Sequence, residues 1–445
     1  MRLSVIGCGY LGAVHSACMA ELGHDVVGID IDPAKVDGLN AAEPPFFEPG
    51  LPQLLSSSIA SGRLRFSTDM ADAAGSSVHF VAVGTPQKRN ENGADLSHVY
   101  AAIDALIPHL RPGDVVVGKS TVPVGTARAL AEKISLQCPE ATLVWNPEFL
   151  REGFAVQDTL APDRLVYGLP EQDNGAQLLL DEVYAKALAD GQPRLLMDYE
   201  TAELVKVSAN AFLATKISFI NAMAEVCEAS GADVSLLADA IGHDARIGRK
   251  FLNAGLGFGG GCLPKDIRAF MARAGELGAD QALTFLREVD SINMRRRSRM
   301  VDLTREVCGG SLLGQRIAVL GLAFKPNSDD VRDSPALSVA AQLQLQGASV
   351  TASDPQAVPN ASKRFPDLNY TNSIEEAVRG ADAVLVLTEW EQYRGIDPQW
   401  LAGLVSRAAV VDGRNCLDAQ TWREAGWTYR ALGRPKVPAM APVVA

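Results

Sequence analysis

A cysteine set among glycines is the first feature of this chain that could do chemistry. The stretch GFGGGCLPKD, residues 257–266, places Cys262 directly after three consecutive glycines and shortly before Lys265 and Asp266. Glycine at that density weakens any helix or strand. The stretch should therefore serve a function that compensates for its weaker order. A thiolate is a nucleophile that can form covalent intermediates. A flexible surface loop with an incidental thiol explains the local stretch as well, so the remainder of the chain must decide.

A lysine and an asparagine on a long predicted helix are the second candidates. Residues 199–230 contain no glycine or proline and are apolar around much of the helix, which predicts one long, largely buried helix. Lys206 and Asn210 are spaced i, i+4 and therefore share one face. Burying an unpaired ammonium costs several kcal/mol, because the charge loses its hydration. Lys206 therefore either extends to solvent or is paired or active.

The elements that would position such residues begin with a nucleotide-binding pattern. An apolar strand and a G-x-G-x-x-G turn in residues 3–12 lead into an amphipathic helix, and a second strand over 24–32 ends near Asp30. These glycines permit a tight turn, pyrophosphate approach and close packing of helix on strand, while the helix N-terminus attracts phosphate. A carboxylate at Asp30 suits a ribose and repels a 2′-phosphate, which favours NAD over NADP. The three glycines are Gly7, Gly9 and Gly12.

Three further predicted strands end in polar turns. They lie within residues 77–86, 114–126 and 142–153. Because ligands of doubly wound sheets bind beyond the carboxyl ends of the strands, side chains in these turns should face a cofactor crevice. Two carboxylates in the third turn either bind there or are merely solvated. The candidate residues are Thr85, Ser120, Thr121, Glu148 and Glu152.

A second, similar module starts near residue 314. Residues 314–335 repeat the strand and glycine turn with a degenerate G-x-A, and residues 348–355 mirror the second strand with Asp354 at its end. Further strands are predicted within 381–390 and 408–415. The predicted fold class is therefore α/β, with two Rossmann-like doubly wound parallel-sheet domains joined by a long central helix. Two such domains could bind two different nucleotides.

Composition sets limits on partners and location. The 445 residues predict two or three domains, and a net charge of −12 argues against general affinity for nucleic acid or anionic membrane. No stretch is apolar over the length needed to span a bilayer, and no signal peptide is recognised. Seven scattered cysteines without a CxxC pair suggest neither a zinc site nor disulfides, which fits a reducing cytoplasm.

The basic run at 295–299 is expected to be a solvated helix face, with a phosphate site as the alternative. The tail 433–445 is assigned no role.

With these motifs in order, the chain resembles the UDP-glucose/GDP-mannose dehydrogenase family along essentially its whole length. Residues 244–266 look most like the branch that oxidises UDP-glucose. Gly261 departs from the family, in which serine usually precedes the cysteine. The resembling stretches are GCGYLG, EPGL (48–51), VGTP, STVPVGT, NPEFLREG, KVSANAFLATKISFINAMAEVCE, GFGGGCLPKD, GLAFKPNSDDVRDSP and DGRN.

The resemblance implies a four-electron oxidation of UDP-glucose to UDP-glucuronate with two NAD⁺. Cys262 would add to the C6 aldehyde as a thiohemiacetal, which gives a second hydride and becomes a thioester. Glycines ahead of it would keep backbone bulk away from the reacting carbon. Lys206 and Asn210 would stabilise the oxyanion, and Asp266 would hold a water or the lysine. Glu148, with Thr121 positioning water, would act as the base for thioester hydrolysis.

The same resemblance implies binding residues, a homodimer built on the long helix, and three domains at 1–196, 197–300 and 301–445. Arg246 looks like the arginine that family members lend across the dimer interface. The implied cofactor positions are Gly7, Gly9, Tyr10, Leu11, Gly12, Asp30, Lys35, Val83, Gly84, Thr85, Pro86, Ser120, Thr121, Glu152, Lys265 and Arg332. The implied substrate positions are Glu148, Phe149, Leu150, Arg151, Lys206, Asn210, Arg246, Phe251, Asn253, Gly259, Phe324, Lys325 and Arg414.

Three alternatives stay open. The first is a dehydrogenase of GDP-mannose or another nucleotide sugar with the same machinery, which a panel of sugars would distinguish. The second is a two-electron hydroxyacid dehydrogenase, which needs no cysteine and has no second nucleotide fold. The third is a catalytically silent sensor of nucleotide sugars, which would bind them without forming NADH.

Overall fold

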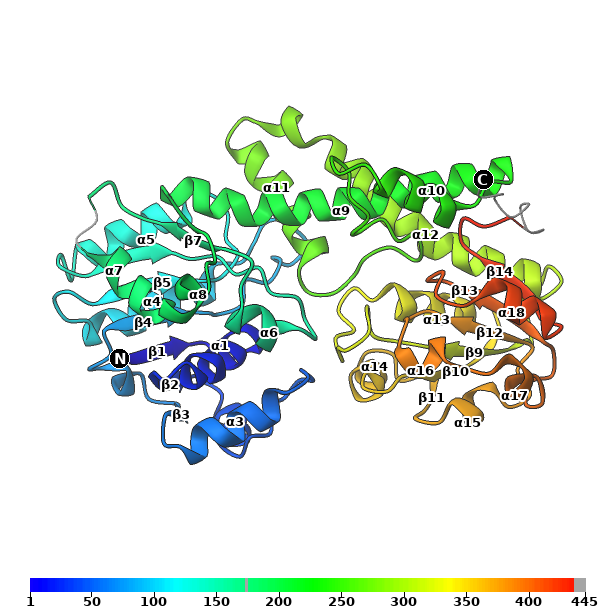
Figure 1. Ribbon diagram of the computed structural model, residues 1–445, viewed down its shortest axis with the longest axis horizontal. Coiled ribbons are helices and arrows are strands. Elements are labelled where there is room, and N and C mark those ends of the chain that lie inside the picture. Colours follow the sequence, from blue (N-terminus) through cyan, green and yellow to red (C-terminus); the bar gives the residue numbers. More distant parts are fainter. Residues whose placement is uncertain (173–174, 436–445) are drawn as a thin grey trace. The chain divides into compact units, whose positions relative to one another are not determined.

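The computed structural model describes residues 1–172 and 175–435, so most of the tail 433–445 lies outside the described residues. The described chain forms two compact units. The first comprises Met1–Ala209 and Arg268–Asp280, and the second comprises Asn210–Ile267 and the residues from Gln281 onward. Figure 1 shows the strands of the first unit in blue to green and those of the second in yellow to red.

The sheet of the first unit has the strand order β3-β2-β1-β4-β5-β6-β7-β8. Its first six positions follow the order 3-2-1-4-5-6 that is typical of dinucleotide-binding domains. Neighbouring strands are parallel except β6 and β7, which pair antiparallel. The strands are β1 (Arg2–Ile6), β2 (Asp25–Ile29), β3 (Leu64–Ser67), β4 (Val78–Val81), β5 (Val115–Gly118), β6 (Thr142–Trp145), β7 (Leu165–Gly168) and β8 (Arg194–Met197).

Helices cover both faces of this sheet, as the strand sequences require. The strands are apolar at consecutive positions, so both faces must be buried. Leu3 and Val5 belong to the cluster with α1 and α3, whereas Ile6 belongs to the cluster with α4 and α5. The helices of this unit are α1 (Tyr10–Glu21), α2 (Pro33–Asn40), α3 (Leu51–Ala60), α4 (Ser97–Leu106), α5 (Thr126–Ser135), α6 (Ala155–Leu160), α7 (Ala176–Val183) and α8 (Ala185–Ala189).

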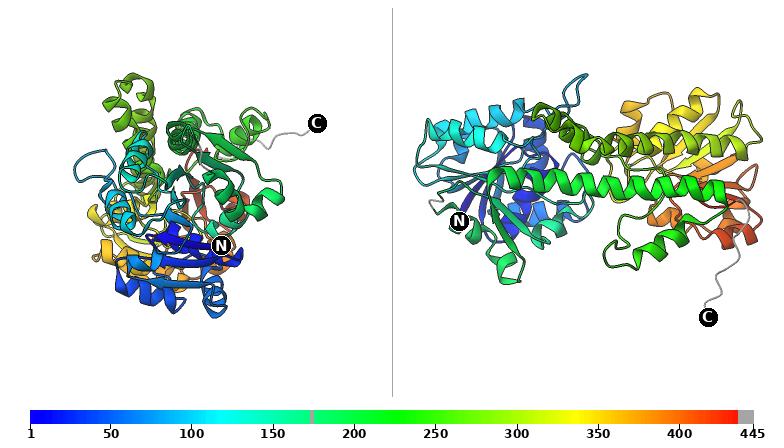
Figure 2. Two further views of the ribbon diagram at one scale, coloured as in Figure 1. Left: turned by 90° about the vertical axis from the view of Figure 1, so that its left-hand side faces the viewer. Right: turned by 90° about the horizontal axis from the view of Figure 1, so that it is seen from above.

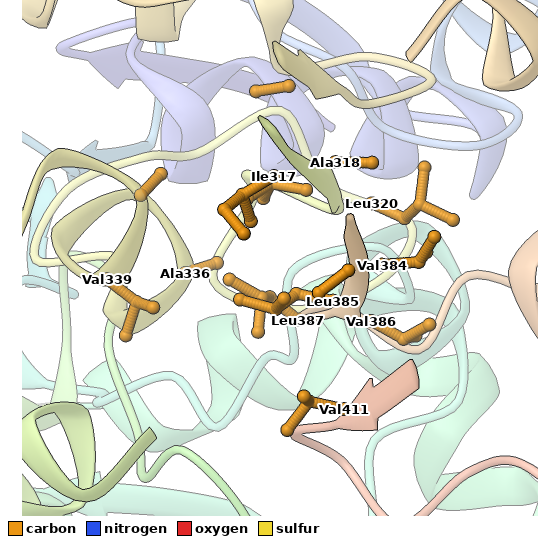
Figure 3. Packing of buried hydrophobic residues seen from close by; sticks show 14 of the residues in the cluster. Ile317, Ala318, Leu320, Ala336, Val339, Val384, Leu385, Val386, Leu387 and Val411 are labelled. Carbon is orange, nitrogen blue, oxygen red and sulfur yellow. The ribbon is translucent and has the colours of Figure 1, made fainter. Parts of the chain in front are cut away.

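The sheet of the second unit repeats the same topology. Its order is β11-β10-β9-β12-β13-β14, with every neighbouring pair parallel. Figure 3 shows apolar side chains of β9, β12 and α13 (Pro335–Leu345) in its core, among them Ile317, Val339 and Leu385. The strands are β9 (Arg316–Leu320), β10 (Ser349–Ser353), β11 (Asn369–Thr371), β12 (Ala383–Val386), β13 (Ala409–Asp412) and β14 (Thr428–Ala431).

The helix predicted over 199–230 is confirmed as α9 (Tyr199–Ser230), which runs from one unit into the other and appears as the long green helix of Figure 2. No helix within residues 1–172 and 175–435 is long and apolar enough to cross a membrane. The remaining helices are α10 (Val234–Gly242), α11 (Leu263–Glu276), α12 (Phe285–Val307), α13 (Pro335–Leu345), α14 (Val358–Arg364), α15 (Ile374–Val378), α16 (Glu391–Arg394), α17 (Pro398–Ala402) and α18 (Ala419–Glu424).

The glycine turns of the two sheets match, and in each an acid after the second strand accepts from a backbone N–H of the turn. Gly321 N donates to Ser353 O at 2.8 Å, just as the glycine after β1 donates to the last residue of β2. Asp354 is 1% exposed, and its carboxylate accepts from Leu322 N at 2.7 Å and from Trp390 Nε1 at 3.1 Å. The second acid therefore stabilises the turn and the strand ends around it.

The expectation of a solvated basic face at 295–299 is wrong for two of its arginines. Arg296 is fully buried on α12 and pairs with Glu228 at 3.1 Å. Arg297 is 5% exposed and pairs with Asp333 at 2.9 Å. Burying a guanidinium requires a carboxylate partner, and both arginines have one. These two pairs show that this side of α12 is part of the interior of the second unit.

Candidate active site

The glycine turn after β1 has the geometry that the fingerprint predicted. Gly7 has φ +88°, and a Cβ on Gly12 would lie 1.8 Å from Gly7 O, so both positions require glycine. A Cβ on Gly9 would meet no described atom within 4 Å, which leaves this position open to a ligand. Among the described side chains none caps α1, which begins at Tyr10 and continues through Leu11, so its first N–H groups can meet an anion.

Asp30 and Lys35, both predicted to bind the cofactor, form an ion pair. Lys35 Nζ lies 2.8 Å from Asp30 Oδ2, which also accepts from Cys8 N at 2.8 Å. Asp30 is 7% exposed. An adenosine ribose would therefore meet a carboxylate that shares its charge with an ammonium. The lysine weakens the repulsion of a 2′-phosphate that Asp30 alone would exert.

Two hydroxyls join the loops that follow β4 and β5. Thr85 Oγ1 donates to Thr121 O at 2.8 Å, and Ser120 Oγ donates to Val83 O at 2.7 Å. The structure thereby brings together the predicted cofactor residues of both loops. The loop after β4 contains Val83, Gly84, Thr85 and Pro86, and the loop after β5 contains Ser120 and Thr121.

Glu148, in the loop after β6, pairs with Lys206 of α9. Glu148 Oε1 lies 2.9 Å from Lys206 Nζ, and Glu148 Oε2 accepts from Leu150 N at 2.6 Å. Burial would raise the pKa of Glu148, but Lys206, the Leu150 N–H and Lys119 together lower it below its ordinary value. The ring centroid of Phe149 lies 5.7 Å from Lys206 Nζ. Lys206 is thus paired, and Glu148 is held as a carboxylate.

The rest of that loop is fixed by a residue that the sequence analysis did not single out. Glu48, 2% exposed, accepts from Gly153 N at 2.6 Å and also from the Tyr10 hydroxyl. It thereby links the glycine turn to the loop that carries Glu152. Arg151 Nη2 in the same loop pairs with an aspartate oxygen at 2.6 Å. The proline and glycine of the EPGL stretch signalled a turn, but the contact of Glu48 with Gly153 is long-range and had no local signal.

Lys119 is a second buried residue that the sequence analysis did not single out. It is 6% exposed, and Nζ donates to Asn146 Oδ1 at 2.9 Å and contacts Tyr184 Oη at 3.3 Å. Burial lowers its pKa to about 8, while the Glu148 carboxylate favours its charged form. A lysine at the end of the apolar strand in 114–126 was the available signal.

In the second unit, Asp266 joins two of the predicted residues at the start of α11. Its carboxylate accepts from Asn210 Nδ2 at 2.6 Å and from Lys265 Nζ at 2.6 Å, and it is 3% exposed. Asp266 N donates to Cys262 O at 3.0 Å, and Cys262 itself is exposed. The thiol therefore sits at the first turn of a helix whose own aspartate orients an amide and an ammonium.

The glycines before the thiol are packed against the loop that follows β9. Gly260 N donates to Arg332 O at 2.8 Å, and a Cβ on Gly259 would lie 2.4 Å from Asp333 O. A Cβ on Gly261 would lie 2.3 Å from Arg332 Cζ. The departure from serine at Gly261 therefore leaves room for the arginine that was predicted to bind the cofactor.

The predicted nucleotide-sugar residues of the second unit form one group and one exposed segment. Arg414 donates to Phe324 O at 3.0 Å and to Gly257 O at 3.1 Å, and Lys325 Nζ lies 5.5 Å from the Phe324 ring centroid. The segment after α10 contributes Arg246, Phe251 and Asn253. The Arg246 side chain is 88% exposed and pairs with Asp244.

The candidate residues thus divide between the two units. The first unit holds the glycine turn, the three strand-end loops and Lys206. The second holds Asn210, the thiol loop (residues 257–262), Asp266 and the group around Arg414. The first set suits a dinucleotide, and the second combines a nucleophile with cations suited to a diphosphate.

Three domain models of one protein family match the chain. They are the NAD binding domain of the UDP-glucose/GDP-mannose dehydrogenase family over residues 1–188, its central domain over 200–295, and its UDP binding domain over 318–419.

Relatives match over nearly the full length. The chain is 43% identical to a UDP-glucose 6-dehydrogenase of Rhizobium meliloti, over 98% of this chain and 100% of that protein. It is 41% identical to the UDP-glucose 6-dehydrogenase TuaD of Bacillus subtilis, over 99% and 95%. A solved UDP-glucose dehydrogenase of Pyrobaculum islandicum superposes with a TM-score of 0.88 at 38% identity, over 97% and 98% of the two chains. A solved GDP-mannose dehydrogenase of Pseudomonas aeruginosa gives 0.53 at 28% identity, over 97% and 100%.

Proposed function

We propose, because this chain belongs to the UDP-glucose/GDP-mannose dehydrogenase family, that it oxidises UDP-glucose to UDP-glucuronate with two NAD⁺ and one water. Membership confirms the predictions of the family, of NAD as cofactor and of a nucleotide-sugar dehydrogenase. The observation that carries the choice of sugar is 43% identity over 98% of the chain with a UDP-glucose 6-dehydrogenase.

Two side chains serve the first oxidation. Removing hydride from C6 requires that the alcohol proton pass to water and that the developing oxyanion be stabilised. Lys206 supplies an ammonium, and Asn210 supplies an amide whose orientation is set by Asp266 at 2.6 Å. NAD⁺, when bound, would supply the hydride acceptor for both oxidations. The glycine turn and the loops after β4 and β5 would hold that cofactor.

Cys262 makes the second oxidation possible. An aldehyde has no alkoxide to expel a second hydride, so the thiolate adds to C6 and forms a thiohemiacetal. Loss of hydride from that carbon gives a thioester on Cys262. Water then attacks the thioester carbonyl, and the thiolate leaves as the carboxylate forms. The exposure of Cys262 at the beginning of α11 supports this role.

Glu148 is the base for the hydrolytic step. Its pKa is lowered mainly by Lys206 against the effect of burial, so it is a carboxylate at neutral pH. It can accept a proton from the attacking water, which the Thr121 carbonyl or hydroxyl helps to position.

The test is a substrate panel in which NADH is counted per sugar. UDP-glucose, GDP-mannose and UDP-N-acetylglucosamine are supplied in turn, with NAD⁺ in excess. Two NADH per UDP-glucose are expected, with little turnover of the other two sugars. Turnover of another sugar, together with no turnover of UDP-glucose, would identify that other sugar as the substrate. One NADH per substrate would favour a two-electron dehydrogenase, and binding without NADH would favour a sensor.

The assembly that we propose is a homodimer in the cytoplasm, in which three domains divide the chain at about residues 196 and 300. An apolar row on α9 supports the dimer, because Phe212, Phe219 and Val226 are 67%, 48% and 57% exposed and are spaced i, i+7, i+14. The exposure of Arg246 suits a residue that acts in a neighbouring subunit. A reducing compartment suits an exposed nucleophilic thiol.

A further inference from the structure

Asn293 of α12 forms two hydrogen bonds with the backbone of the thiol loop, one through its side-chain oxygen and one through its side-chain nitrogen. Phe258 N donates to Asn293 Oδ1 at 2.7 Å, and Asn293 Nδ2 donates to Phe258 O at 3.0 Å. Asn293 is fully buried, and Phe258 is 5% exposed. Both polar groups of one loop residue are thus satisfied by a single side chain in the interior, four positions before Cys262.

The neighbouring glycine is shaped around this side chain. Gly257 has φ +91°, and a Cβ there would lie 2.1 Å from Asn293 Oδ1. The left-handed backbone and the close approach both require glycine. The glycines of this stretch therefore do more than reduce bulk near the thiol, because one of them lets a buried amide bond the loop.

One turn later on α12, Arg297 holds the other side of the loop. Its guanidinium donates to Asp333 O at 3.3 Å and to Asp333 Oδ1 at 2.9 Å. Asp333 O is the atom against which Gly259 packs. Asn293 and Arg297 are spaced i, i+4 and share one helix face. The same face of α12 therefore forms hydrogen bonds both with the loop before Cys262 and with the segment at Asp333 against which that loop packs. The basic run at 295–299 thereby acquires a structural reason.

We infer that Asn293 is a positioning residue for Cys262. It fixes the backbone of Phe258 and thus the path of the glycines that lead to the thiol, while its own side chain is fully buried. A nucleophile displaced by about 1 Å can lose up to about a hundredfold in rate. The inference rests on the proposed role of the thiol, but the anchoring of the loop can be measured without any turnover.

The experiment compares Asn293→Ala with Asn40→Ala. Asn40 makes the same pair of bonds to one residue, with Phe66 N at 2.9 Å and Phe66 O at 3.0 Å, in the first unit. Amide hydrogen exchange over residues 255–262 is followed in the ligand-free protein, and kcat and KM for UDP-glucose are then measured. In Asn293→Ala we expect exchange over 255–262 to accelerate and kcat to fall about tenfold or more. KM should stay within about threefold, because the substrate cations are unchanged. Asn40→Ala should leave both measurements at the wild-type level.

Asn293→Asp provides a second readout that does not depend on tolerance of the alanine. The aspartate keeps an acceptor for Phe258 N–H, but it can donate to Phe258 O only when it is protonated. Its kcat relative to wild type should therefore rise as the pH falls. Unchanged exchange over 255–262 in Asn293→Ala, or a flat ratio in Asn293→Asp, would overturn the anchoring. Faster exchange with an unchanged kcat would show that the anchor does not position the thiol. If Cys262→Ser still yields two NADH per sugar, the proposed role of the thiol fails while the anchoring measured by exchange stands.

Discussion

Glu148 Oε1 and Lys206 Nζ lie 2.9 Å apart, with their side chains 15% and 7% exposed. The pair resolves the problem posed by a lysine on a largely buried helix, because each charge offsets the desolvation of the other. It also links two roles, since the ammonium proposed for the oxyanion keeps the proposed base ionised. Loss of either side chain should therefore affect the charge state of the other.

The first prediction concerns the stability of this pair. Lys206→Met leaves the Glu148 carboxylate buried without its counterion, which should cost about 3–5 kcal/mol at pH 8. Adding Glu148→Gln removes the buried charge and should recover part of that loss. Urea unfolding of the wild type, both single variants and the double variant measures the coupling. Strictly additive losses would contradict a direct pair.

The pH dependence of the Lys206→Met effect has a definite sign. In the wild type the folded-state pKa of Glu148 is lowered, so its stabilising contribution is present above the ordinary value of 4.5 and is lost as the pH falls through the folded value. In Lys206→Met burial prevails and raises that pKa, so the variant regains stability as Glu148 takes up a proton. The difference between wild type and variant should shrink between pH 8 and pH 5. An equal difference at both pH values would be the contrary result.

The second prediction concerns Lys119. Burial lowers its pKa from 10.5 to about 8, so the folded state releases this proton before the unfolded state does. The wild type should therefore gain stability relative to Lys119→Met between about pH 8 and pH 10.5, by at most about 1.4 kcal/mol per pH unit. Unfolding by urea across that range measures the trend. Lys186→Met, at an exposed position on α8, is the matched control, and an equal trend in the two variants would contradict the assignment.

Local patterns predicted the fold, whereas the contacts of the site needed the structure. The fingerprint, the strand-end turns and α9 depend on short-range propensities, which residues such as Gly7 and Gly12 display directly in the sequence. The burial of Arg296 depends on Glu228, far away in the chain, so the basic run indicated only a solvated face. The bonds of Asn293 to Phe258 are likewise long-range, and an asparagine inside a helix has no local signature.

The third prediction concerns Cys262. Cys262→Ser removes the thiol that is proposed to capture the aldehyde, so formation of UDP-glucuronate from UDP-glucose should fall by about a thousandfold or more. The first hydride transfer, which the thiol does not serve, should still yield at most one NADH per sugar. Binding of NAD⁺ and of the UDP-sugar, measured by calorimetry, should change little, because the serine keeps the shape of the loop. Cys138→Ser, at a half-buried position outside the site, is the control. Retention of two NADH per sugar at a normal rate would exclude the thioester route, and loss of folding would identify Cys262 as a structural residue.

The fourth prediction tests the dimer through Arg246. Arg246→Ala and Cys262→Ser should each form almost no UDP-glucuronate alone, since the first lacks a substrate cation and the second lacks the nucleophile. If Arg246 acts in the neighbouring subunit, a mixed dimer contains one site with both defects and one intact site. Random mixing makes half of the dimers mixed, so activity should recover to about a quarter of the wild-type level. If the arginine acts within its own chain, each site of the mixed dimer carries one defect and no activity returns. Phe219→Asp, which places a charge on the exposed row of α9, should abolish the recovery by separating the subunits, and light scattering would detect the monomer.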